Sequence, residues 1–417
     1  MKSYVYIGPF SELVTMQQLP LKGALSDDAL QIIHHGGILI EDHRIHAIGT
    51  HKELYPEAKK LGAAIMHIEG TKVGMPGLID AHTHICFSGS RARDYSLRNA
   101  GKTYLEIAKA GGGIWDTVTQ TRKASRDELV KGIILRAQRH LRHGITTLEV
   151  KSGYGLSIAE ELKMLRAIRE ANEALPIDLI STCLAAHMLP RDYKGTQEEY
   201  LKEMASVLLP KIKEENLSHR VDAFIEEGAF SKATISPYFK KAAQLGFDIT
   251  VHADQFSVGG TEVAVRFNAL SADHLEASTA AEIQLLAKSN VIAMALPGAS
   301  LGLGCNFTPA RKLLDAGATL AIASDHNPGS APMGNLLTQA SLLGAFEKLT
   351  NAEVLSGITF RAAAALGFKD RGILATGYKA DITLFDTNEY REILYNQGSL
   401  QPSMVFKEGN LVYSESS

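Results

Sequence analysis

Two histidines separated by one residue follow a short apolar run near residue 80. His82 and His84 come after Leu78–Ile79, and Asp80 precedes them at the same alternating spacing. In a β-strand, side chains two residues apart point to the same face, so the two imidazoles would lie side by side. Neutral imidazole is the commonest metal ligand, and this pattern supplies half of a tetrahedral zinc-type site. Taken alone, the pair could also be two histidines beside a turn.

Other residues that can bind a metal or carry a proton also stand at the ends of apolar runs. They are Lys151 and Tyr154, His187, Glu226 and Glu227, His252 with Asp254 and Gln255, Asp273 and His274, and Asp325 with His326 and Asn327. If these runs are parallel strands of one barrel, their carboxyl ends share the rim at which such barrels carry active sites. A single histidine at a strand end is usually structural, but five strands that each supply His or Asp indicate a catalytic metal site.

The expected ligand set is three nitrogens and one carboxylate, from His82, His84, His252 and Asp325. This set suits one Zn²⁺ or Fe ion. Such a metal would lower the pKa of a bound water toward neutrality and polarise a carbonyl oxygen. We expect Asp325 also to hold the proton of the water, and His274 to shuttle protons or stabilise an oxyanion. Lys151 leaves open a second arrangement, in which a carbamylated lysine bridges two metals.

Several residues near these ligands could bind a substrate. Arg91 could hold a carboxylate in a bidentate clamp, or it could be a surface arginine. Tyr154 lies between two glycines, which let the backbone and the hydroxyl approach a ligand. Asn327, Gly329 and Ser330 belong to a Pro-Gly loop whose N–H groups could bind an anion, although ordinary turn chemistry explains the loop equally well.

The elements that must position these residues repeat as a short apolar run, a polar end and a helical segment. After the run near residue 80, the apolar runs lie at 145–155, 177–188, 221–230, 248–255, 270–276, 291–298 and 319–329. Strands that alternate with helices pair in parallel, and eight such units over about 250 residues suit a closed (β/α)₈ TIM barrel. An open doubly wound sheet is the alternative, because periodicity does not show closure.

Both ends of the chain read as β-strands. Residues 36–49 have two apolar runs around a polar turn, and residues 408–410 form a turn between two further runs. We expect residues 1–75 and 370–417 to form one small β-sandwich domain, and residues 76–369 to form the barrel.

Composition and charge exclude several classes of protein. The 417 residues include 43 basic and 46 acidic ones, for a net charge of −3, so neither a nucleic-acid nor a membrane surface is indicated. Three distant cysteines fit a reducing compartment better than a disulfide framework. The start of the chain lacks the pattern of a signal peptide, and the most apolar stretch, 291–304, is too short to cross a bilayer. We expect a cytoplasmic protein that acts on a small molecule.

Motifs along nearly the whole chain resemble the amidohydrolase superfamily, and within it the imidazolonepropionase family. They are PGLIDAHTHICFSGSR (76–91), AGGGIWDTVTQTRKAS (110–125), EVKSGYGL (149–156), AAHMLP (185–190), VHADQ (251–255), SADHLE (271–276) and SDHNPGSAP (324–332). The first motif and the loop around Asp325 are partly shared by many amidohydrolases. The combination of AGGGI, EVKSGYGL and SDHNPGSAP is specific to the imidazolonepropionase family.

The resemblance implies a hydrolase of cyclic amides that opens 4-imidazolone-5-propanoate to N-formimidoyl-L-glutamate in L-histidine degradation. It implies one Zn²⁺ or Fe ion per subunit on the four ligands above, and a homodimer. Substrate contacts would come from Arg91, Tyr154, His187, Gln255, Asn327, Gly329 and Ser330. The residues themselves agree, because a propanoate needs cationic or N–H partners and the ring carbonyl needs the metal.

One position departs from the family pattern, because some members carry Glu where this chain has Gln255. An amide cannot take a proton at neutral pH, so Gln255 can only orient substrate or water. Proton transfer must then be carried out by His274 and Asp325.

Two rival functions stay open at this point. Another amidohydrolase, such as a deaminase of a purine-like ring or a cyclic-imide hydrolase, would share the metal site, but a neutral ring would not need Arg91. A non-catalytic metal-binding scaffold is the other possibility. The complete ligand set argues against it, because a decayed site tends to lose a ligand first.

Overall fold

The protein, seen in a computed structural model that describes residues 2–415, contains two eight-stranded sheets. One sheet is parallel, and its strands follow one another in chain order. They are β6 (Leu78–Asp80), β7 (Ile145–Lys151), β8 (Asp178–Ala186), β9 (Arg220–Ile225), β10 (Asp248–Ala253), β11 (Ser271–His274), β12 (Ile292–Ala295) and β13 (Leu320–Ile322). The predicted eight strand–helix units and their parallel pairing are confirmed.

The first and last strands of this sheet are joined through the residues that follow them. Thr83 bridges His326 in parallel register, and the His84 N–H donates to the His326 carbonyl at 2.9 Å. The Asp325 N–H donates to the His82 carbonyl at 3.0 Å. The sheet is therefore a barrel and not an open doubly wound sheet. Closure occurs at the residues that the sequence predicts to carry the site.

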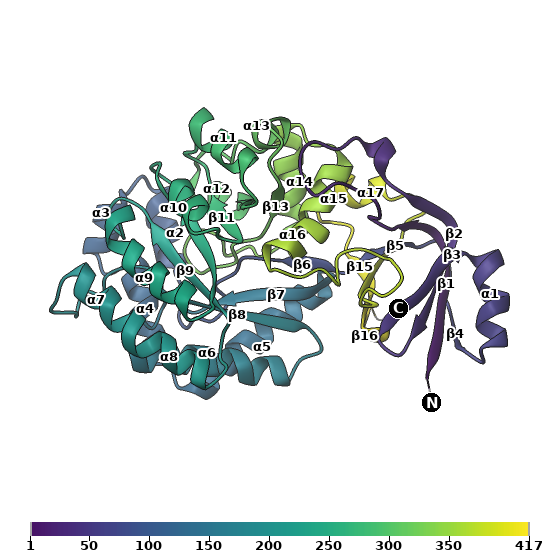
Figure 1. Cartoon of the computed structure of the whole chain (residues 1–417), viewed down its shortest axis with the longest axis horizontal. Coiled ribbons are helices and arrows are strands. Elements are labelled where there is room, and N and C mark those ends of the chain that lie inside the picture. Colours follow the sequence, from purple (N-terminus) through teal and green to yellow (C-terminus); the bar gives the residue numbers. More distant parts are fainter. Residues whose placement is uncertain (1, 416–417) are drawn as a thin grey trace.

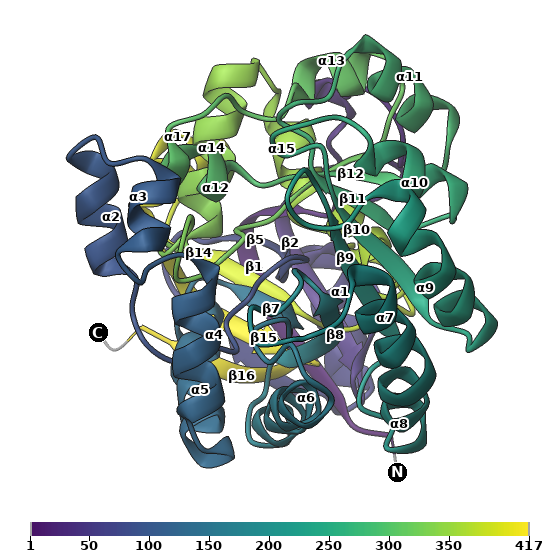
Figure 2. The ribbon, with the colours of Figure 1, turned by 90° about the vertical axis from the view of Figure 1, so that its left-hand side faces the viewer.

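Helices surround the barrel strands (Figure 2). They are α2 (Ala92–Asn99), α3 (Tyr104–Lys109), α4 (Ile114–Lys123), α5 (Arg126–Arg142), α6 (Ile158–Glu173), α7 (Gln197–Glu203), the π-helical η2 (Met204–Leu208), α8 (Leu209–Glu214), α9 (Lys232–Gln244), α10 (Gly260–Arg266), α11 (Ala280–Lys288), α12 (Pro297–Leu303), α13 (Ala310–Asp315), α14 (Leu336–Glu347), α15 (Asn351–Gly357) and α16 (Phe360–Ala365). Helices α2 to α4 lie in the chain between β6 and α5. Helix α5 packs against β7 and α6.

Helix α5 shows how local sequence sets these boundaries. Ser125 and Glu128 form a capping box that satisfies N–H groups at the start of the helix. Leu129, Ile133 and Ala137 recur every four residues and are buried on the face toward the barrel. Beyond the helix end, Gly144 has a φ of +84°, a conformation that favours glycine and that ends the helix.

The second sheet combines both ends of the chain, and both termini lie beside it (Figure 1). Its strands are β1 (Tyr4–Val14), β2 (Ile32–Glu41), β3 (Arg44–Thr50), β4 (Ala64–His67), β5 (Val73–Pro76), β14 (Ile382–Phe385), β15 (Pro402–Lys407) and β16 (Asn410–Ser414), with the helical segments η1 (Asp27–Ala29), α1 (His51–Lys60) and α17 (Arg391–Tyr395) between them. The hairpins predicted at 36–49 and 408–410 are present as β2–β3 and β15–β16.

Strands from both chain ends enclose one apolar core, which includes Ile7, Phe10, Ile38, Ile382 and Phe406. The composite β domain is thus confirmed, while its division from the barrel at residues 75 and 369 stays a prediction.

A charge cluster around the half-buried Asp178 joins the two domains. Asp178, at the start of β8, lies 2.6 Å from the Arg371 guanidinium and 2.9 Å from the Lys407 ammonium of β15. Lys379 lies 3.4 Å from the same carboxylate. Within residues 2–415, no helix combines the length and the apolar character needed to cross a membrane.

Candidate active site

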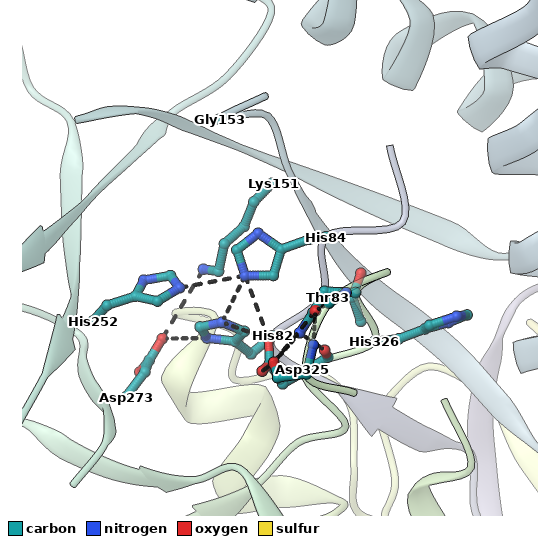
Figure 3. Close-up of polar contacts among 12 residues, drawn as sticks. His82, Thr83, His84, Lys151, Gly153, His252, Asp273, Asp325 and His326 are labelled. Carbon is teal, nitrogen blue, oxygen red and sulfur yellow. Dashed lines mark hydrogen bonds and ion pairs between the residues drawn. The ribbon is translucent and has the colours of Figure 1, made fainter. Parts of the chain in front are cut away.

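Three histidine side chains converge inside the rim of the barrel (Figure 3). The Nε2 atom of His84 lies 3.2 Å from Nε2 of His82 and 3.3 Å from Nε2 of His252. All three side chains are buried. His82 and His84 follow the end of β6, with the bridged Thr83 between them, and β10 brings His252 to them from across the barrel.

The donor chemistry of this cluster fits a metal ion. His82 donates from Nδ1 to the Asp273 carboxylate at 2.7 Å, and Nδ1 of His252 lies 2.9 Å from the Asp222 carboxylate. A neutral imidazole has one N–H, so Nε2 of both rings then carries a lone pair. Lone pairs that face one another in a buried space need a shared cation, and neutral imidazole binds Zn²⁺ or Fe²⁺ through such a nitrogen.

Burial keeps these imidazoles in the neutral form that a metal requires. It is the main cause that lowers the pKa of His82 and of His84 well below the usual value. It also lowers the pKa of His252 to about 4, although Asp222 acts in the opposite direction. All three rings are therefore ready to bind a metal at neutral pH.

Asp325 adds a carboxylate to the histidine cluster. Its Oδ1 lies 3.4 Å from Nε2 of His84 and 3.6 Å from Nε2 of His82, and this buried oxygen has no hydrogen-bond partner among the described residues. Burial raises the pKa of Asp325 to about 6. The Asp325 backbone has a φ of +50°, a strained conformation of the kind that is concentrated at functional sites. The structure thus brings the Asp325 carboxylate beside two of the three histidines with which the sequence predicts it to bind a metal.

Lys151 lies beneath the histidines within a group of carboxylates. Its Nζ atom is 2.7 Å from Glu149, 2.9 Å from Asp222 and 4.0 Å from Asp273. Burial by itself would lower the pKa of Lys151, but the three carboxylates outweigh burial and hold that pKa above its usual value. A carbamate at this position would add a negative charge to three others. The arrangement therefore favours an ammonium group, and one metal over two.

His274 faces the metal site from β11. Its ring centroid lies 5.3 Å from that of His252 and 6.0 Å from that of His82, and its Nδ1 is 3.5 Å from the Glu276 carboxylate. Burial would lower the pKa of His274, but Glu276 outweighs it and the pKa lies above the usual value. The φ of His274 is +88°, so its backbone is also strained.

The rings of His187 and Tyr154 lie next to His84 in the histidine cluster. The His187 ring stacks on His84 with centroids 5.8 Å apart, and the Tyr154 ring lies 5.6 Å from His187 and 6.0 Å from His84. His187 is oriented by a 2.9 Å contact between its Nδ1 and the Gly153 carbonyl. These two side chains form a wall against which a flat ring can lie.

Arg91 borders a cavity of about 300 Å³ together with Asn327 and Gly329. Its Nε pairs with the buried Asp94, which leaves the outer guanidinium nitrogens for a ligand. Asn327 accepts the N–H groups of Gly329 at 2.7 Å and Ser330 at 2.8 Å. These two N–H groups, which the sequence suggested for an anion, are thus occupied inside the loop. Arg91 is the cation that remains for a carboxylate.

The structure gives other rim residues structural contacts. Glu226 accepts the N–H groups of Phe256 and Ser257, and His326 pairs through Nδ1 with Nε2 of His140 at 2.8 Å. Asp254 accepts three backbone N–H groups of the segment 259–261. Gln255 is half-buried in the loop that follows β10.

Sequence reasoning missed Asp222 and Glu149, and it did not assign a role to Asp273. Each is a carboxylate within a strand whose residues are all or nearly all buried, and a buried carboxylate needs a partner.

Comparison with known proteins identifies the family. The model of the amidohydrolase family matches residues 73–412. An imidazolonepropionase of Bacillus cytotoxicus is 41% identical over 410 residues, which cover 97% of this chain and 95% of that protein. An imidazolonepropionase of Alkaliphilus oremlandii is 39% identical over 98% of this chain and 97% of its own length. The chain belongs to the imidazolonepropionase family of amidohydrolases.

Solved structures of a triazine hydrolase and a guanine deaminase share the fold. A triazine hydrolase from Arthobacter aurescens superposes with a TM-score of 0.76 at 17% identity, over 99% of this chain and 95% of that one. A guanine deaminase from C. acetobutylicum superposes with a TM-score of 0.69 at 16% identity, over 99% of this chain and all of the other. The barrel and composite β domain are thus the amidohydrolase architecture.

Proposed function

We propose that this site hydrolyses the ring amide of 4-imidazolone-5-propanoate to N-formimidoyl-L-glutamate, a step in L-histidine degradation. The observation that carries the proposal is the convergence of three imidazole nitrogens, with the Asp325 carboxylate beside two of them, near the cavity that Arg91 borders. The histidines and Asp325 are suited to metal-dependent hydrolysis, and Arg91 is suited to bind a substrate with a carboxylate. Full-length similarity to imidazolonepropionases supports the same reaction.

His82, His84, His252 and Asp325 would hold one Zn²⁺ or Fe ion. When bound, such an ion supplies an activated water and polarises a carbonyl oxygen. The Nδ1 contacts to Asp273 and Asp222 fix the orientation of His82 and His252, so the site requires little rearrangement before it acts.

The protons and the substrate are handled by the remaining residues. Asp325 is a buried carboxylate with a raised pKa of about 6, suited to accept a proton from water. His274, paired with Glu276, is suited to donate a proton to the ring nitrogen that leaves. The Gln255 side chain is an amide that cannot take up a proton at neutral pH, so it would orient the substrate or the water.

The substrate would lie between the metal ligands and the Arg91 cavity. Arg91 would bind the propanoate, because its outer nitrogens offer paired donors to a carboxylate. Tyr154 and His187 would contact the face of the imidazolone ring. Asn327, Gly329 and Ser330 would shape the loop against which the propanoate packs. The family resemblance further suggests a homodimer in the cytoplasm.

One incubation tests the reaction. The purified protein, with its metal content measured, is mixed with enzymatically generated imidazolone propanoate, and loss of the ring absorbance is followed together with formimidoylglutamate. We expect stoichiometric conversion, and none with Asp325→Asn. Metal-loaded protein that leaves the substrate intact would refute the function. Turnover of a purine ring or a neutral cyclic imide instead would assign the site to a different amidohydrolase reaction.

A further inference from the structure

Lys151 has no role in the proposed reaction, yet it is among the most completely buried large side chains described. Fully buried lysines are rare, because removing an ammonium group from water is costly unless carboxylates surround it. Here three carboxylates from three strands do so: Glu149 on β7, Asp222 on β9 and Asp273 on β11.

Two of these carboxylates also contact metal-site histidines. Asp222 lies 2.9 Å from both Lys151 Nζ and His252 Nδ1, through the same oxygen. Asp273 accepts from His82 Nδ1 at 2.7 Å through the oxygen that faces Lys151. Figure 3 shows Lys151, Asp273 and His82 as parts of one connected group beside His252. The ammonium group is thus the common partner of both aspartates.

The third carboxylate has a different connection. Glu149 accepts from Lys151 at 2.7 Å and from the Thr83 N–H at 3.2 Å, and it contacts no ligand histidine directly. Thr83 lies between His82 and His84, so Glu149 supports the backbone that carries them. The cluster therefore separates two tasks, which are holding the backbone and aiming two rings.

We infer that Lys151 is a positioning residue of the metal site, which holds Asp222 and Asp273 so that they direct Nε2 of His252 and His82 toward one point. The inference rests on the proposed metal ligands. Partners of ligand histidines typically change metal affinity by about 10–100-fold when they are removed. We therefore expect Lys151→Met to weaken metal binding by about 10-fold or more, since both orienting aspartates lose their cation.

Metal affinity is measured on the metal-free full-length protein by competition with a chromophoric chelator, and the Co²⁺ absorption spectrum reports the ligand geometry. The matched control is Lys407→Met, because Lys407 is also buried between two carboxylates, Asp178 and Asp381, but lies in the β domain. We expect the control to lower the Tm and leave metal affinity and spectrum unchanged. Unchanged affinity and spectrum in Lys151→Met would overturn the inference.

A double variant separates positioning from charge balance. Lys151→Met with Glu149→Gln removes one charge of each sign and leaves both aspartates without their cation. Positioning predicts that the double variant folds but still binds metal about 10-fold or more weakly. Recovery of wild-type affinity would show that Lys151 only neutralises Glu149.

If both variants fail to fold while Lys407→Met folds, Lys151 belongs to the core and the inference falls. The wild-type protein is measured in the same series, so absence of metal binding there would refute the proposed metal site instead.

Discussion

Replacement of Arg91 by methionine tests whether the substrate carries a carboxylate. The Arg91 side chain is 10% exposed and borders the cavity, with Nε engaged by Asp94. A hydrogen bond to a charged group contributes about 1.5–3 kcal/mol, so losing this contact should raise KM by about 10–150-fold. The contact is made to a part of the substrate that does not react, so kcat should change little.

The assay is steady-state hydrolysis of imidazolone propanoate, with KM and kcat determined separately. Arg93→Met is the control, because Arg93 lies two residues away, is exposed, and contacts only the Ala110 carbonyl among the described groups. Methionine replaces the aliphatic part of the arginine side chain, and Asp94 still accepts the Gly113 N–H at 2.9 Å, which limits disturbance of the loop. An unchanged KM in Arg91→Met would refute the assignment of Arg91 to the carboxylate.

Three further predictions concern the site and the domain contact. Gln255→Ala should mainly raise KM and His274→Ala should mainly lower kcat, because an amide can orient but cannot transfer a proton; steady-state kinetics with the reverse pattern would contradict this division. Removal of the metal by chelation should abolish hydrolysis and lower the Tm, and Zn²⁺ or Fe²⁺ should restore both; activity that survives verified metal loss would contradict the metal site. Asp178→Asn should cost about 1.5 kcal/mol of unfolding free energy at pH 7, because Arg371 and Lys407 lose the carboxylate that they share and each keeps one other, Asp370 and Asp381. Burial opposes ionisation of Asp178, but Lys407 and the neighbouring cations outweigh it and hold the pKa below the usual value. Ionised Asp178 therefore stabilises the fold at pH values above its unfolded pKa of about 3.9, and this stabilisation is lost as the pH falls through the folded-state pKa. Urea unfolding should accordingly show a smaller difference between wild type and Asp178→Asn at pH 3 than at pH 7.

Much of the barrel could be predicted because its signals are local. The apolar run before His82 and the helical spacing in 126–142 each depend on neighbours a few residues away. Alternation within a strand also places His82 and His84 on one side without reference to the rest of the chain. Parallel pairing then follows from the order of strands and helices, and the rim location of His252 and Asp325 follows from the barrel.

The carboxylates that contact His252 and His82 could not be predicted from local signals. Asp222 and Asp273 appear in the sequence only as carboxylates within short predicted strands, about 30 and 190 residues from His252 and His82 respectively. The anion loop shows the same limit, since only the folded loop reveals that Asn327 occupies its N–H groups.

The sequence by itself therefore determined which residues can bind a metal, on which strand ends they stand, and which family the chain resembles. Only the tertiary structure decided that Lys151 lies among three carboxylates, and that two of these carboxylates contact His252 and His82. The physical reason is that side-chain direction along a strand depends on local backbone geometry. The charge state and the partner of a buried group depend instead on what the register of neighbouring strands brings within a few ångströms.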